Sequence, residues 1–161
     1  MKIKKMFYLI TVILIVFFIT VYPRNNQVEQ RIIDYINENY QGENVVIDLK
    51  HFTDFDWDRV MIFKYPTTAE EIENELGVQY EKSLDLTSGI VFVLNDEIVY
   101  DEVFENDYDG PPHFFIYPQS DINAKTNYRV FSKEDADFLG EKRTHENGTY
   151  YVLYPYENIN N

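Results

Sequence analysis

Cysteine is absent from the 161-residue sequence, and histidine occurs only three times. A chain without cysteine has no disulfides, no thiolate metal ligands, no thiol nucleophile and no N-terminal cysteine for lipid attachment. The histidines, His51, His113 and His145, match no HExxH or other metal-ligand spacing, and no serine stands in a G-x-S-x-G context. We therefore expect no catalytic, cofactor-binding or metal-binding residue, and a protein that is not an enzyme.

Positive charge is also scarce, with 14 Lys and Arg against 28 Asp and Glu and a formal net charge of −14. Residues 1–22 hold three of the basic residues and none of the acidic ones, so residues 23–161 carry 11 minus 28, or −17. A domain this acidic is repelled by nucleic acid and by anionic polymers, and it attracts basic proteins or divalent cations. This excludes nucleic-acid binding and favours a basic protein as the partner.

One long uncharged run is present, MFYLITVILIVFFITVY at residues 6–22. As an α-helix it would be about 25 Å long, at the short end of what a bilayer core requires. The run is long for a signal peptide and lacks a small-x-small cleavage site, which favours a retained anchor over a cleaved signal or a buried helix. Lysines precede the run and only Arg24 follows closely, so the positive-inside rule places the later residues outside the cytoplasm. The predicted organisation is a cytoplasmic tail and transmembrane signal anchor at 1–22, a stalk at 23–27 and an extracytoplasmic domain at 28–161.

Two helices are predicted from spacing and capping signals, and a third segment carries only a helix-start pattern. VEQRIIDYINENY at 28–40 has apolar residues at helical spacing and Gly42 as a stop signal. TTAEEIENELG contains a Thr68 to Glu71 capping box and has Gly77 at the C-cap position. SKEDADFL opens with a cap-like Ser-x-x-Asp pattern and is expected to form one or two helical turns.

The remaining segments read as strands rich in β-branched and aromatic residues. Asn95-Asp96 and Asn147-Gly148 each separate two such segments and predict β-hairpins, because these residues tolerate the positive φ of a tight turn. Aromatics make up 17% of the chain, which is ample for a packed core. The expected fold is α+β: one compact domain with an antiparallel sheet and two or three short helices. The predicted strands are 45–49, 59–65, 89–94, 97–104, 114–118, 127–131 and the segments flanking 147–148.

The stretch TDFDWDRVMIFKYP, residues 53–66, places three aspartates around the only tryptophan. Asp54, Asp56 and Asp58 imitate the first ligands of a calcium loop, but the sixth position is arginine and the twelfth is tyrosine. ENDYDG at 105–110 matches the early positions better, yet proline follows it and its twelfth position is isoleucine. Both stretches fail as EF-hands, and turn chemistry explains them better, with weak calcium binding as an open alternative. The candidate partner-binding residues are Asp54, Asp56, Trp57, Asp58, Glu105, Asp107 and Asp109.

Trp57 is expected to anchor the core or its edge. Phe55, Trp57, Met61 and Phe63 share one face of an extended strand, with Val60 and Ile62 on the other, so we expect the strand to be buried on both faces beyond Arg59. The aspartates then lie at the solvated entrance of this strand. A second interpretation stays open, in which Asp56 or Asp58 has a raised pKa beside the tryptophan and forms part of a catalytic carboxylate pair.

The segment from residue 52 to 77, followed by IVFVLNDEIVYDEVF, resembles a group of small envelope proteins of Gram-positive bacteria that are membrane-anchored or lipoproteins. The shared pattern is F-x-W-D-x-V-x-I-F followed by a short acidic helix that ends in Leu-Gly, and it covers about a third of the chain. Lys64-Tyr65-Pro66 stands where the pattern has x-Pro-Tyr, so the turn after the strand departs from it. The resemblance implies a fold and an envelope location, and it implies no reaction.

Three functions are compatible with these features. The first is a membrane-anchored, outward-facing acidic domain that binds a protein or an envelope component. The second is an immunity or inhibitor protein that masks the basic surface of a secreted toxin or enzyme. The third is an envelope hydrolase with paired carboxylates, which requires a pocket lined by acids.

Overall fold

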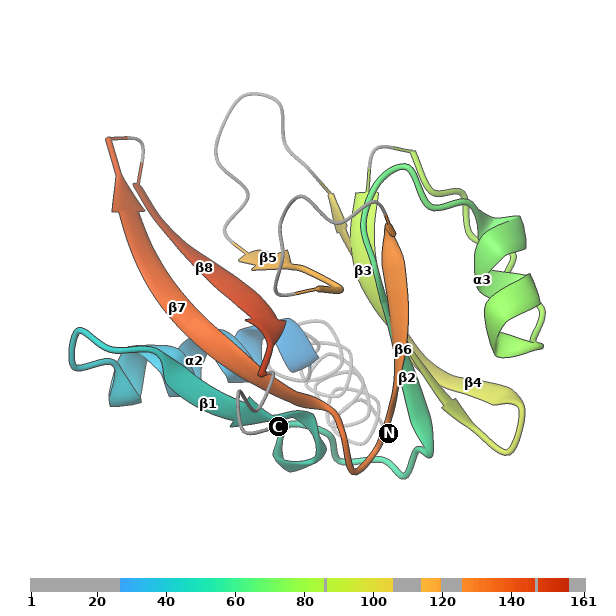
Figure 1. Ribbon diagram of the computed structural model, residues 1–161, viewed down its shortest axis with the longest axis horizontal. Coiled ribbons are helices and arrows are strands. Elements are labelled where there is room, and N and C mark those ends of the chain that lie inside the picture. The colour runs from blue at the N-terminus through green and yellow to red at the C-terminus, as the bar shows by residue number, and fades with distance from the viewer. Residues whose placement is uncertain (1–26, 86, 106–113, 120–125, 147, 157–161) are drawn as a thin grey trace, which may run out of the picture.

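The computed structural model describes residues 27–85, 87–105, 114–119, 126–146 and 148–156. Within these residues the chain forms a compact α+β domain with two four-stranded sheets (Figure 1). The first sheet has the strand order β1 (Val45–Asp48), β7 (Asp137–His145), β8 (Gly148–Pro155) and β5 (Phe114–Ile116). The second sheet has the order β4 (Glu97–Glu105), β3 (Thr87–Leu94), β2 (Arg59–Phe63) and β6 (Tyr128–Ser132). The helices are α2 (Val28–Asn39), the short 3-10 helix η2 (Leu49–His51) and α3 (Ala69–Leu76).

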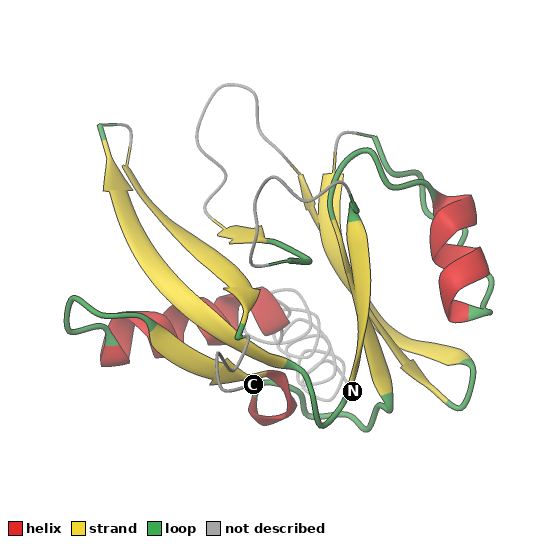
Figure 2. Ribbon diagram, in the orientation of Figure 1, coloured by secondary structure: helices red, strands yellow, loops and turns green. Residues whose placement is uncertain are grey.

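The α+β class and the mainly antiparallel pairing are confirmed, but the strands form two sheets where one was expected. The single parallel pair among the described strands joins β5 to β8. Figure 2 shows that the helices lie on either side of the second sheet. No helix within the described ranges is long and apolar enough to cross a membrane. The predicted anchor at 6–22 lies outside those ranges.

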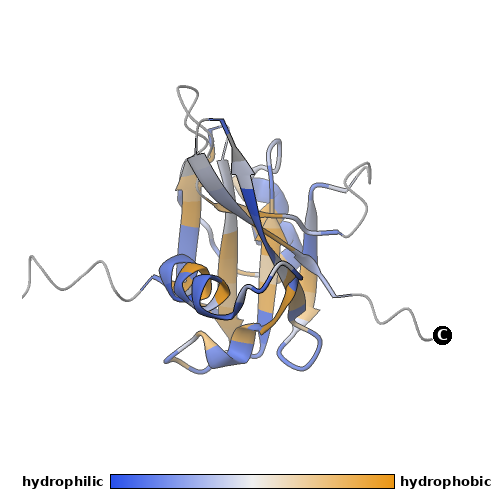
Figure 3. Ribbon diagram, turned by 90° about the vertical axis from the view of Figure 1, so that its left-hand side faces the viewer, coloured by the Kyte–Doolittle hydropathy of each residue, from blue (hydrophilic) through white to orange (hydrophobic). Residues whose placement is uncertain are grey.

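The main core fills the space between the two sheets and α2. Val28, Ile32 and Ile36 recur at helical spacing and are almost fully buried, so one face of α2 enters this core. Figure 3 shows the matching division of α2 into hydrophilic and hydrophobic parts. At Gly140 on β7 an added Cβ would lie 2.7 Å from Ile36 Cδ1, so the glycine lets α2 approach the first sheet closely.

A smaller core lies on the opposite face of the second sheet and is covered by α3. Ile72 and Leu76 of α3 pack against Met61, Phe63 and neighbouring side chains. The predicted capping box is confirmed, with reciprocal bonds between Thr68 and Glu71, and Gly77 is in the left-handed conformation at φ 69°. The second sheet is therefore covered on both faces, which confirms the prediction that β2 is buried on both sides beyond Arg59.

Both predicted hairpins form, and the third predicted helix does not. Asn95 and Asp96 have φ of 50° and 65°, as a tight turn between β3 and β4 requires. His145 pairs with Gly148 at the end of the β7–β8 hairpin. The segment after Ser132 is a short turn that joins the second sheet to the first, closed by Asp135 N–H donating to Ser132 O at 3.1 Å. The Ser-x-x-Asp pattern was misread as a helix start because the same side-chain pair also stabilises tight turns.

Candidate functional site

Trp57 is a core residue, with 2% of its surface exposed. Its ring meets that of Phe92 edge to face at 5.0 Å, and its indole N–H donates to Thr53 Oγ1 at 3.0 Å. The core prediction is confirmed, but the predicted face is wrong. Trp57 packs with Val60 and Ile62 rather than with Met61, because the chain is not extended before β2 begins at Arg59. Because Trp57 is buried, a partner that binds here would contact the neighbouring aspartates rather than the tryptophan ring.

The three aspartates around Trp57 point to three different parts of the domain. Asp54 forms an ion pair with Arg31 of α2 at 2.8 Å. Asp56 is 88% exposed and lies 3.6 Å from Lys133 in the turn between the sheets. Asp58 Oδ2 accepts the backbone N–H of Asn95 at 2.8 Å and so holds the β3–β4 turn. Among the described residues no group of three or more acidic or histidine side chains is arranged to hold a metal.

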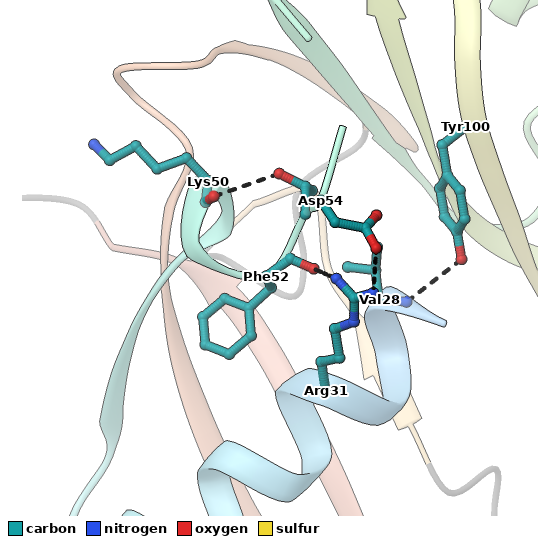
Figure 4. A network of polar contacts seen from close by, with 7 residues as sticks. Val28, Arg31, Lys50, Phe52, Asp54 and Tyr100 are labelled. Carbon is teal, nitrogen blue, oxygen red and sulfur yellow. Dashed lines mark hydrogen bonds and ion pairs between the residues drawn. The ribbon is translucent and has the colours of Figure 1, made fainter. Parts of the chain in front are cut away.

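Arg31 is the centre of the network in Figure 4. Its guanidinium donates to Phe52 O at 3.2 Å and to Asp54 Oδ2 at 2.8 Å. The hydrogen bond to Arg31 lowers the pKa of Asp54 below its ordinary value. These contacts hold the loop after η2 against α2, so Asp54 has a structural role.

The second predicted acidic stretch is separated from the first. Glu105 is the last residue of β4 and pairs with Thr87, whereas Asp58 contacts the turn at the other end of the same hairpin. Asp107 and Asp109 lie outside the described residues. The partner-binding role proposed for these acids stays a prediction.

Glu102 on β4 is a buried carboxylate that the sequence analysis did not single out. It is 7% exposed, and burial raises its pKa above the ordinary value, partly offset by hydrogen bonds from α2 and Tyr100. Its Oε2 accepts the backbone N–H of Glu29, while its Oε1 has no hydrogen-bond partner among the described residues. The only feature of the sequence that could have indicated burial of Glu102 is that it alternates along the strand with Tyr100 and Phe104 on the same side. The hypothesis that Asp56 or Asp58 forms part of a catalytic carboxylate pair beside Trp57 stays a prediction.

A second surface that the sequence analysis missed is the outer face of the first sheet. Phe138, Tyr151 and Leu153 point into the main core, so by strand alternation the residues between them point outward. The described helices pack elsewhere, α2 on the inner face and α3 on the second sheet. The name "outer face" is used here for the side chains of Phe115, Glu141, Arg143, Tyr150, Val152 and Tyr154.

The outer face is rich in aromatic rings around one ion pair. Phe115 meets Tyr150 edge to face at 5.8 Å and lies opposite Val152 in the parallel ladder. Glu141 and Arg143, two residues apart on β7, are joined at 2.7 Å with their side chains 25% and 46% exposed. The face therefore combines half-buried apolar surface with balanced charge. The two strands that supply its aromatic rings, FFI and YYVLYP, are apolar on their two sides, so the sequence did not indicate which side lacked a covering helix.

No known protein family, curated protein or solved structure matches this chain in the comparisons made.

Proposed function

We propose that the chain is a single-pass membrane protein whose folded domain lies outside the cytoplasm and binds another protein or an envelope component through the outer face. The apolar run at 6–22 and the lysines before it support the location. The observation that carries the binding role is the aromatic outer face, which no described helix covers.

Such a face has the composition of a protein interface. Tyrosine and other aromatics are enriched in interfaces, and they dominate the residues whose truncation costs most binding energy. Tyr150 and Phe115 offer ring surface, and the Glu141–Arg143 pair supplies polar groups that can orient a partner. The proposed activity is therefore recognition.

A second candidate, an immunity or inhibitor protein, is favoured by α3. This helix carries Glu70, Glu71, Glu73 and Glu75 and no basic residue in its last turn. Glu71 is used in the capping box and Glu73 accepts the backbone N–H of Tyr80, whereas Glu70 and Glu75 are exposed. An acidic helix can mask a basic active site on a toxin or enzyme.

Site-specific photocrosslinking in the native cell separates these two proposals. A photoreactive residue at Tyr150 samples the outer face, and one at Glu75 samples α3, in otherwise identical tagged full-length chains. A specific partner captured from Tyr150 alone supports binding through the outer face, and capture from Glu75 alone supports the inhibitor. Capture from neither position would contradict both.

A further inference from the structure

We propose that the outer face binds a second copy of this chain, so that two first sheets pack face to face about a two-fold axis. This rests on the proposed function, because it names the partner of the same face. Sheets stack in this way about 10 Å apart, with the side chains of the two facing layers interdigitated.

The charge of the chain restricts where two copies can meet. Each copy carries a formal net charge of −14, so copies that approach through most of their surfaces repel each other. The contact must therefore use a region in which apolar surface is present and charge is balanced. The outer face meets this condition, since Glu141 is paired with Arg143 and their partners across the β7–β8 ladder, Val152 and Tyr150, are uncharged.

The order of the two charges makes the face complementary to itself. Glu141 and Arg143 lie on the same side of β7 because they are two residues apart in a strand. A two-fold axis that passes between them brings Glu141 of one copy against Arg143 of the other, and the reverse contact follows by symmetry. A face with two like charges at these positions would repel its own copy.

Tyr150 supplies apolar contact on one flank of this charged centre, because it pairs with Arg143 across the β7–β8 ladder. Val152, which pairs with Glu141, is only 3% exposed and adds no contact surface. Phe115 extends the same surface onto β5. The result is a polar centre with aromatic surface beside it, which suits reversible association of two folded domains.

Charge reversal in full-length chains tests the proposal. Two differently tagged copies are expressed together, and the capture of one tag with the other is measured after the membranes are dissolved in detergent. Glu141→Arg places two positive charges on the outer face, and Arg143→Glu places two negative charges there. Each variant alone should lower self-capture about tenfold or more, because like charges then face each other across the axis.

Mixing the two variants restores complementarity. A Glu141→Arg copy expressed with an Arg143→Glu copy should be captured at close to the native level, which loss of folding in either variant could not produce. Glu75→Arg on α3 and Lys82→Glu in the loop that follows it are the matched controls, since each makes the same change in net charge away from the outer face. They should leave self-capture unchanged.

The remaining outcomes overturn the proposal. Absence of native self-capture, or equal loss in the control variants, would show that the outer face does not bind a second copy. If Tyr150 then crosslinks a different protein, the proposed binding function stands and only the identity of the partner is wrong. If Tyr150 crosslinks nothing, both proposals fail.

Discussion

Glu102 on β4 accepts a hydrogen bond from the backbone N–H of Glu29, with 3.2 Å between Oε2 and the nitrogen. Tyr100 completes the arrangement, since its hydroxyl accepts the N–H of Val28 at 3.4 Å and donates to Glu102 at 2.9 Å. The first N–H groups of a helix have no acceptor within the helix, and the helix dipole favours negative charge there. Gln27 makes no side-chain cap, so a strand residue distant in sequence caps α2.

The first prediction concerns the pH dependence that Glu102 adds to stability. Burial raises its pKa above the ordinary value of 4.5. Between the ordinary pKa and the raised pKa the folded protein holds a proton that the unfolded chain has released, so the free energy of unfolding falls as pH rises. Glu102→Gln lacks this group, and its stability relative to the native chain should therefore increase as the pH rises above the ordinary carboxyl pKa.

Thermal unfolding of both chains across this range measures the difference. Subtracting the two curves removes the contribution of the other carboxylates. Glu75→Gln, an exposed residue of α3, controls for the loss of one surface charge. A difference between Glu102→Gln and the native chain that stays constant with pH would show that Glu102 does not titrate in this way.

The second prediction is that Trp57→Ala lowers the free energy of unfolding by about 3–5 kcal/mol, the usual cost of removing a large buried aromatic side chain. The ring is 2% exposed and packs on Phe92. Asp56→Asn, one residue away and 88% exposed, should change stability by less than about 0.5 kcal/mol. Urea unfolding followed by circular dichroism provides the measurement. An unchanged unfolding midpoint for Trp57→Ala would be incompatible with a core role.

Local signals in the sequence were enough to predict most of the elements. The Thr68–Glu71 capping box, the Asn95-Asp96 turn and the helical spacing of α2 depend on neighbouring residues, and all three were predicted correctly. Assignment of strands to two sheets depends on pairs far apart in the chain, such as β1 with β7. Nothing local in VVID distinguishes one partner strand from another.

The site was harder to predict than the fold for the same reason. The aspartates were noticed because they are close in sequence, but Arg31, Lys133 and the β3–β4 turn, which contact them, are not. Glu102 became distinctive only through its contact with the N-terminus of α2. Likewise, the outer face is the side of the first sheet that α2 does not cover, and local sequence does not show which side that is.

The third prediction concerns Arg59, which joins three elements. One guanidinium nitrogen donates to Leu76 O at the end of α3 at 2.9 Å and to Asp96 Oδ1 at 2.6 Å. Arg59→Ala should cost about 1–3 kcal/mol, since it leaves a helix carbonyl without its donor and removes a charge-assisted bond. Asp96→Ala should cost less than about 1 kcal/mol, because the Asp96 side chain is 77% exposed. Urea unfolding compares the two, and equal costs would mean that the contact with α3 contributes nothing.

The last prediction concerns the close packing of Phe63 on Gly89, which pair across β2 and β3. A Cβ added at Gly89 would lie 2.6 Å from Phe63 Cζ and 2.6 Å from the carbonyl oxygen of Glu102. Gly89→Ala should therefore cost about 1–3 kcal/mol, because both the ring and the backbone of β4 must move.

A double-mutant cycle separates the two clashes at Gly89. In a Phe63→Leu background the contact with the ring is gone while the contact with the Glu102 carbonyl remains, so Gly89→Ala should cost less there without becoming neutral. The expected coupling between the two positions, measured by urea unfolding, is about 0.5–3 kcal/mol. If the costs of Gly89→Ala and Phe63→Leu are additive, the Phe63 ring moves aside without cost. In that case only the backbone contact between β3 and β4 limits the size of the side chain at position 89.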